Sequence, residues 1–105
     1  MIAHEDDRRI LESFPEAKII KVKQDCVIGQ HYHKIRTEQF ILVDGRCKLV
    51  VQNVGGIKMK GSQNMKKGQL YVIQPGTYHE FHIEKESVLI GINSHPYDPT
   101  DDYKL

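Results

Sequence analysis

Residues 31–40 read HYHKIRTEQF and place His31, His33 and Glu38 within eight residues, just before an apolar run. Side chains two residues apart on a β-strand point to the same face. Two imidazoles spaced in this way can reach one metal ion at roughly 2.0–2.2 Å. By the same alternation Glu38 cannot simply continue that face. We therefore expect a turn or bulge at residues 34–37, after which a neighbouring strand offers the carboxylate.

The rest of the chain predicts an all-β protein. Short apolar runs alternate with turn signals, of which Asp44-Gly45 and Pro75-Gly76 are the clearest. The expected strands lie within residues 17–28, 37–43, 46–54, 69–73, 78–84 and 87–93, and residues 57–68 are expected to form a short strand and a polar loop. Residues 5–14 predict one or two helical turns ended by Pro15, and residues 94–105 look irregular. Several short strands at this spacing are typical of a sandwich or barrel.

Strand alternation assigns an environment to the histidine at position 79. His79 shares a face with Phe81 and Ile83, whereas His82 falls on the opposite, polar face with Glu80. We therefore expect His79 to point into the barrel and His82 to point out of it.

The same alternation places Cys47 inside the barrel with Leu49 and Val51, where it acts as a small core residue. Val50 then remains as an apolar residue on the outer face. An apolar outer face favours a homodimer, because a second copy would cover it.

Length, charge and cysteine content narrow the class of protein. The 105 residues predict one domain spanning residues 1–105. The formal charge of +1 argues against a nucleic-acid or membrane partner. Cys26 and Cys47 form no CxxC pair, so we expect free thiols in a reducing compartment. No stretch approaches the ~20 apolar residues that span a bilayer, and the charged start is not a signal peptide. A soluble, cytoplasmic protein is expected.

Two spaced motifs resemble those of the cupin superfamily. His31, His33, Glu38 and Gly45 fit the first motif, and Gly68, Gly76 and His79 fit the second. Three positions depart from the pattern, because Asp25, Gln74 and Ile83 replace the usual Gly, Pro and Asn. The resemblance implies a jelly-roll barrel, or double-stranded β-helix, with a short N-terminal extension. It also implies that His31, His33, Glu38 and His79 hold one divalent metal ion in the barrel mouth. Zn, Mn, Fe, Ni and Co all suit such ligands.

A narrower resemblance is to the small nucleotide-sugar 3,4-ketoisomerases of surface-polysaccharide synthesis. The matching residues are His31, His33, Lys34, Glu38, Gln39, Gly45, Cys47, Tyr97, Asp98, Asp102 and Tyr103. This resemblance implies that His31 and His33 are catalytic and move a proton beside the sugar ketone, without a metal. Those enzymes are longer and usually lack a second-motif histidine. His79 therefore favours a metal-binding cupin.

Three functions follow from these patterns. The leading hypothesis is a metal-binding cupin that isomerises or epimerises a carbohydrate or nucleotide-sugar substrate. The alternatives are an Fe- or Ni-dependent dioxygenase and a non-catalytic module that binds a small ligand. Lys34 and Arg36 either bind a phosphate or carbonyl or lie in an exposed turn. Three tyrosines either line a sugar pocket or pack at barrel edges: Tyr71, Tyr78 and Tyr97.

Overall fold

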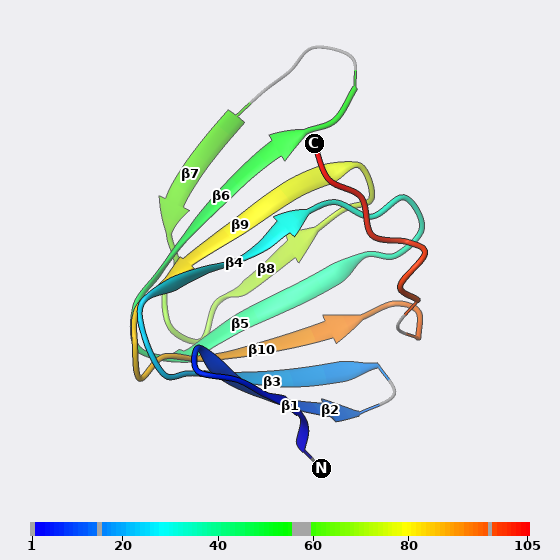
Figure 1. The fold of residues 1–105 in the computed structure, drawn as a ribbon. Helices are drawn as coiled ribbons and strands as arrows, with labels where there is room; N and C mark the ends of the chain where they lie inside the picture. Colours follow the sequence, from blue (N-terminus) through cyan, green and yellow to red (C-terminus); the bar gives the residue numbers. More distant parts are fainter. Residues whose placement is uncertain (1, 15, 56–59, 97) are drawn as a thin grey trace.

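The computed structural model describes residues 2–14, 16–55, 60–96 and 98–105, and the regular structure in these ranges is entirely β. The strands are β1 (Ile2–Glu5), β2 (Arg9–Phe14), β3 (Ala17–Val22), β4 (Cys26–His31), β5 (Glu38–Asp44), β6 (Cys47–Asn53), β7 (Lys60–Asn64), β8 (Leu70–Ile73), β9 (Thr77–Ile83) and β10 (Val88–Asn93). They form a six-stranded sheet, in the order β1-β2-β3-β10-β5-β8, and a four-stranded sheet, in the order β4-β9-β6-β7 (Figure 1).

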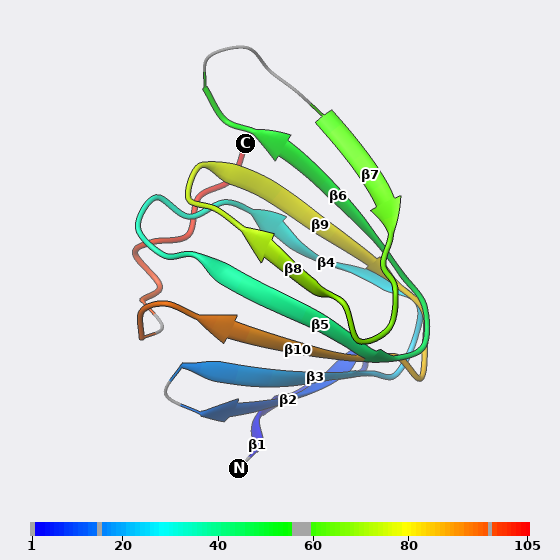
Figure 2. The same ribbon diagram turned by 180° about the vertical axis from the view of Figure 1, so that it is seen from behind.

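The core lies between the two sheets, which face each other as in a jelly roll (Figure 2). Phe40, Leu42 and Leu89 point inward from the six-stranded sheet, and Leu49 and Phe81 point inward from the four-stranded sheet. All five are buried, because strand alternation sends every second side chain to the same face. The predicted double-stranded β-helix is confirmed.

Two local predictions were wrong. Residues 9–14 form strand β2 instead of helical turns, because their backbone pairs along its length with β3. A helix this short gains little by itself, so pairing with a sheet outweighs local propensity. Residues 17–28 are two strands instead of one, since the chain turns at residues 23–25 and passes to the other sheet. Within residues 57–68, predicted as a short strand and a polar loop, residues 57–59 lie outside the described residues and β7 covers Lys60–Asn64.

The predicted apolar outer surface around Val50 on β6 is not found, and the large exposed apolar residues of the described strands lie on the other sheet. Val50 is only 8% exposed within a single chain, so its side chain gives no reason for a dimer. An apolar row instead crosses the outer face of the six-stranded sheet, in the register Leu70, Ile41, Ile90 and Ile19. Beside it, Val72 and Ile92 are 46% and 40% exposed.

No helix among the described residues is long and apolar enough to cross a membrane.

Candidate metal centre

Two of the predicted ligands come from neighbouring strands of the four-stranded sheet. His31 ends β4 and is the register partner of His79 in β9. A bulge precedes His31, with Gly29 and Gln30 at φ 90° and 59°. Such a bulge redirects the following side chain. A Cβ on residue 29 would lie 3.0 Å from the His79 carbonyl oxygen, so glycine suits this position.

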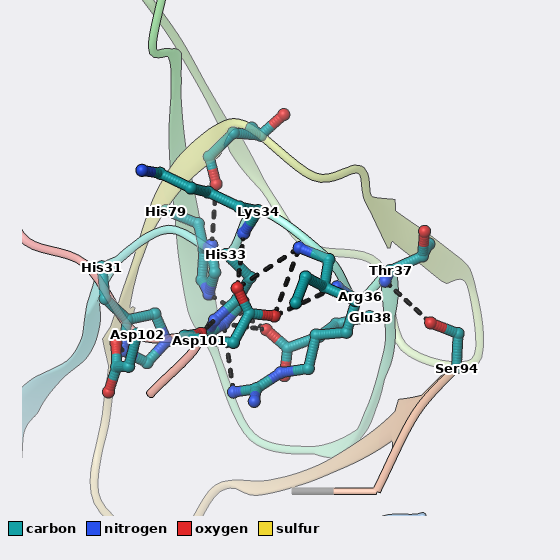
Figure 3. A network of polar contacts seen from close by, with 12 residues as sticks. His31, His33, Lys34, Arg36, Thr37, Glu38, His79, Ser94, Asp101 and Asp102 are labelled. Carbon is teal, nitrogen blue, oxygen red and sulfur yellow. Dashed lines mark hydrogen bonds and ion pairs between the residues drawn. The ribbon is translucent and has the colours of Figure 1, made fainter. Parts of the chain in front are cut away.

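Glu38 reaches the same point from the opposite sheet. The chain leaves β4, turns through residues 32–37 as predicted, and begins β5 at Glu38. However, β5 lies in the other sheet, so the prediction that a neighbouring strand offers the carboxylate was wrong. The ligand atoms of His31, His33, Glu38 and His79 all lie within 4.8 Å of one another (Figure 3). His33, Glu38 and His79 are at most 2% exposed, whereas the His31 side chain is 18% exposed. The structure therefore brings all four predicted residues together, and His31 is the one nearest solvent.

Each histidine is held by its Nδ1 atom. His33 Nδ1 lies 2.6 Å from the Asp101 carbonyl oxygen, and His79 Nδ1 lies 3.2 Å from the Thr77 carbonyl oxygen. A carbonyl oxygen only accepts, so both Nδ1 atoms carry the proton. His31 Nδ1 lies 3.0 Å from an oxygen of the Asp102 carboxylate. Nε2 is therefore the unprotonated nitrogen of His33 and His79, and it is the remaining nitrogen of His31.

The oxygen that faces these nitrogens has no proper hydrogen bond. Glu38 Oε1 lies 2.8 Å from His33 Nε2 and 3.4 Å from His79 Nε2, yet it is a buried oxygen without a hydrogen-bond partner of acceptable direction. A carboxylate oxygen and unprotonated imidazole nitrogens that meet in this way repel one another, and a cation between them would relieve this repulsion. The donor set of three nitrogens and one oxygen, with each histidine held at its second nitrogen, fits a divalent transition metal.

The electrostatics keep these groups in the form that binds a metal. Burial lowers the pKa of His31 to about 3 and that of His79 to about 4, and the neighbouring histidines add to the shift at His31. Burial would raise the pKa of Glu38. However, contact with His33 and the charge of Lys18 outweigh this effect and hold that pKa far below its ordinary value. At neutral pH, His31 and His79 are therefore uncharged and Glu38 is ionised.

These shifts predict that the metal-free protein loses stability in acid. In the unfolded chain both histidines take up protons below their ordinary pKa of 6.5, whereas the folded chain resists protonation until about pH 4. Between those values the unfolded state binds more protons, so the free energy of unfolding falls as the pH falls. We expect a loss on the order of 1 kcal/mol per histidine per pH unit. Urea unfolding of chelator-treated protein at pH 7 and pH 5 measures it.

Two glutamine variants sharpen this test. His79→Gln should reduce the pH dependence by removing one buried imidazole. His82→Gln should leave it as it is, because the His82 side chain points outward, is 39% exposed and bonds Glu80. Equal pH dependence in all three proteins would show that the buried histidines do not cause it.

Lys18 is a site residue that the sequence analysis missed. Its Nζ lies 3.3 Å from Glu38 Oε2 inside the barrel. The side chain crosses Gly91, its register partner in β10, where a Cβ would lie 2.9 Å from Lys18 Cε and 2.8 Å from the Phe40 ring. Strand alternation held the necessary signal, because Lys18 has the same parity as the buried Ile20 and Val22.

Of the two basic residues that follow the histidine pair, Arg36 is buried and Lys34 is exposed. Arg36 is 3% exposed, so the predicted exposed turn is wrong for this residue, and its Nη2 donates to His33 Nε2 at 3.3 Å. A cavity of about 490 Å³ lies next to Arg36, lined by Ile35, Arg36, His95, Pro96, Asp98 and Asp101.

Neither of the two described tyrosines of the predicted sugar pocket lies at the cluster. Tyr71 is buried and its hydroxyl accepts from the Lys66 amide, whereas the Tyr78 hydroxyl donates to Glu80 on the outer side of β9. Tyr97 lies outside the described residues.

Asn93 is a further buried polar residue next to the cluster. It pairs with Glu38 in the β10–β5 ladder and is 8% exposed, and its Oδ1 finds no hydrogen bond among the described residues.

Solved structures with the same fold include both enzymes and a protein-binding domain. CapF of Staphylococcus aureus, a capsular polysaccharide assembling protein, matches with a TM-score of 0.81 and 22% identity over 97% of this chain and 31% of its own. QdtA of Thermoanaerobacterium thermosaccharolyticum, a sugar 3,4-ketoisomerase in complex with TDP, matches with a TM-score of 0.72 and 23% identity over 85% of this chain and 65% of its own. Drosophila melanogaster CENP-C bound to CAL1 also has a TM-score of 0.72, at 17% identity over 87% of this chain and 74% of its own.

At these identities the likeness establishes the fold, and the chain spans less than a third of CapF. Among curated protein sequences, none is significantly similar. The sequence itself decides the family. The family described as FdtA: WxcM-like, C-terminal matches residues 17–104, which include both motifs and the segment after β10, and the chain belongs to this family.

Proposed function

We propose that this chain isomerises or epimerises a keto sugar carried on a nucleotide, at a divalent metal centre formed by His31, His33, Glu38 and His79. The observation that carries the proposal is the convergence of three imidazoles and one unpartnered carboxylate oxygen within 4.8 Å, with each imidazole held at Nδ1. The sugar class follows from the ketoisomerase QdtA, which shares the fold and in one structure, as a histidine-to-asparagine mutant, holds TDP-4-keto-6-deoxyglucose.

The chain's own residues supply binding and orientation. A bound divalent ion would supply Lewis-acid chemistry, polarising a sugar carbonyl so that the adjacent C–H becomes acidic. Lys18 would hold Glu38 through Oε2, which leaves Oε1 to face the histidines. Asn93 offers a buried amide beside Glu38 for a sugar hydroxyl.

The cavity beside Arg36 is the proposed place for the sugar nucleotide. Arg36 and Asp101 line it, and both also touch His33, so a ligand there would be separated from the cluster by these two residues. Its volume of about 490 Å³ falls within the range of small-molecule sites. Roughly a third of QdtA has no counterpart here, so we expect the nucleotide to make fewer contacts than the sugar.

A second candidate is the same reaction without a metal. The direct 2.8 Å contact between His33 and Glu38, and the 3.0 Å contact between His31 and Asp102, favour it. A carboxylate that holds one imidazole nitrogen leaves the other free to accept a proton. In this version His31, the more exposed histidine, removes the proton beside the ketone with Nε2 and returns it to the former ketone carbon, while the hydroxyl proton passes between the two sugar oxygens. His33, whose two nitrogens face Glu38 and Asp101, has a positioning role.

One experiment separates the candidates. Untagged protein is analysed for bound metal, and TDP-4-keto-6-deoxyglucose is then incubated with it in D₂O before and after chelator treatment. Deuterium incorporation into the sugar is followed by NMR. Exchange that disappears with the chelator and returns with added Mn²⁺, Co²⁺, Ni²⁺ or Zn²⁺ supports the metal centre. Exchange that persists in metal-free protein supports the histidine pair alone.

Other outcomes contradict both candidates. Saturable binding of the sugar nucleotide without exchange would make the chain a ligand-binding module, the non-catalytic alternative. Oxygen uptake by the iron- or nickel-loaded protein would instead point to dioxygenase chemistry. Absence of both binding and exchange would remove sugar nucleotides from consideration as substrates.

We also propose that the partner is a second copy of this chain, which covers the outer face of the six-stranded sheet. This face presents the row of Leu70, Ile41, Ile90 and Ile19, flanked by the exposed Val72 and Ile92. Contiguous apolar surface of this kind is uncommon on a monomer and is typical of an interface.

Changing Ile92 to lysine should therefore weaken the dimer. The residue is 40% exposed in the single chain, so the substitution leaves the fold intact while placing a charge in the interface. We expect at least about a tenfold rise in the dimer dissociation constant, or roughly 1.4 kcal/mol. Sedimentation equilibrium measures it, with Lys48→Glu on the outer face of β6 as control. Monomeric wild-type protein would refute the proposed interface.

A further inference from the structure

The segment that follows β10 lies across the edge of the barrel that carries the histidines. In Figure 1 its orange-to-red trace passes the end of β4 and the start of β5. Residues 101–103 of this segment contact residues 31–36 at several places, although some 70 positions separate them in the sequence. These contacts reach both histidines of the first motif.

Asp101 holds the turn between β4 and β5. Its carboxylate accepts from the backbone amides of Lys34, Ile35 and Arg36 at 2.7 to 3.3 Å (Figure 3). Three successive amides form a concave anion site, and here the occupant is the chain's own carboxylate. Hydrogen bonds from these amides outweigh burial and lower the pKa of Asp101. The Asp101 carbonyl oxygen meanwhile accepts from His33 Nδ1.

Asp102 plays the corresponding part at the other histidine. An oxygen of its carboxylate lies 3.0 Å from His31 Nδ1. The side chain is 32% exposed, so it is not needed to fill the core. A carboxylate only accepts hydrogen bonds, so this contact places a proton on His31 Nδ1.

Tyr103 fastens the segment beyond the two aspartates. Its backbone forms a two-way bridge with Tyr32, at 2.9 and 3.0 Å, and the two rings stack with centroids 5.3 Å apart. The Lys34 ammonium lies 4.2 Å from the centre of the Tyr103 ring, a favourable cation–π distance. The Lys34 ammonium therefore already contacts the segment after β10, which makes it less available to bind a substrate phosphate.

From this arrangement we propose that Asp101 and Asp102 are positioning residues, which fix the Nδ1–H form and the orientation of His33 and His31 so that both Nε2 atoms face Glu38. The expected effect of these residues on metal affinity rests on the proposed function. Its structural content, the fixed tautomers, holds with or without a metal. Outer carboxylates and carbonyls of this kind orient metal-binding histidines in other proteins.

The first test reads the tautomers directly in metal-free protein. Long-range ¹H–¹⁵N NMR at pH 8 should show His31, His33 and His79 with the proton on Nδ1. In Asp102→Ala, His31 should become a mixture of tautomers while His79 keeps its form. Asp102→Asn, which retains an acceptor oxygen, should restore part of the wild-type pattern. An unchanged His31 in Asp102→Ala would overturn the role given to Asp102.

The second test measures the affinity for Co²⁺ by competition with a chelating dye. Asp102→Ala should weaken it by about 10- to 100-fold, the usual effect of losing an outer partner. Asp101→Asn should weaken it similarly, because one amide oxygen cannot serve three backbone amides. The matched control is Asp25→Asn, since Asp25 also accepts from a backbone amide, that of Lys85, but away from the site. The control should stay within about twofold of wild type.

The results separate this inference from the function on which it rests. If wild-type protein shows the expected tautomers but binds no Co²⁺, the metal centre fails and the positioning role stands. If wild type binds Co²⁺ and both aspartate variants bind it equally well with unchanged tautomers, the positioning role fails and the metal centre stands.

Discussion

Replacing Glu38 with glutamine should give a folded protein that no longer retains a transition-metal ion. Glu38 supplies the only carboxylate of the four-residue cluster, and its Oε1 is the buried oxygen that the histidines surround. Glutamine keeps the shape but removes the charge that balances a divalent ion. We expect metal content to fall from about one ion per chain to less than about a tenth.

Stability in the presence of metal gives an independent measure of the same loss. A ligand at 100 times its dissociation constant stabilises a protein by about 2.7 kcal/mol, so added Co²⁺ or Ni²⁺ should raise the melting temperature of wild type and leave Glu38→Gln unchanged. The metal-free variant should stay within about 2 kcal/mol of wild type, because the lost ion pair with Lys18 is offset by the removal of a buried charge. Lys18 remains 24% exposed and can reach water.

Glu80→Gln is the matched control. Glu80 is also a glutamate next to a histidine, but it lies on the outer face of β9, where it accepts from Tyr78 and contacts His82. We expect it to keep its metal and its response to added Co²⁺. Equal metal content in the two variants would show that the bound ion lies elsewhere, and full metal retention by Glu38→Gln would refute the proposed centre.

The parts of the candidate site that depend on neighbouring residues in the sequence were predictable. Alternation along residues 79–83 was sufficient to separate His79, which is 1% exposed, from His82 on the outside. The two motifs then grouped His79 with His31, His33 and Glu38, although they lie in two sheets. Alternation would also have found Lys18, had it been applied to β3.

Other features depend on contacts between distant segments and leave little trace in the sequence. Asp101 reaches residues 33–36 only because the segment after β10 folds back across the barrel. That contact also explains why Arg36 is buried in a turn whose composition indicates exposure. Residues 9–14 become a strand for a similar reason, since β3 provides the pairing partner. Local propensity cannot report such partners.

Changing Gly45 to alanine should be among the most damaging single substitutions in the chain. Gly45 adopts φ 90°, and a Cβ there would lie 2.0 Å from Ser87 Oγ and 2.5 Å from Ser87 Cα. Ser87 is completely buried, and its hydroxyl both accepts from the Arg46 amide and donates to the Arg46 carbonyl. The left-handed backbone costs about 1 kcal/mol, overpacking about 1 to 3 kcal/mol, and each lost hydrogen bond about 1 kcal/mol. The free energy of unfolding should therefore fall by roughly 4 to 6 kcal/mol.

Gly68→Ala isolates the backbone contribution. Gly68 has a similar φ of 80°, but a Cβ there would meet nothing within 4 Å, so this variant should lose only about 1 kcal/mol in urea unfolding. Equal losses would mean that the contact with Ser87 relaxes freely.

The Gly45 substitution should also affect the metal centre. Gly45 lies in the turn between β5 and β6, and it packs against Ser87, the residue before β10. β5 carries Glu38, and β6 pairs with the strand that carries His79. A chain that cannot close this hairpin cannot bring the carboxylate to the histidines, so Gly45→Ala should lose metal and stability together.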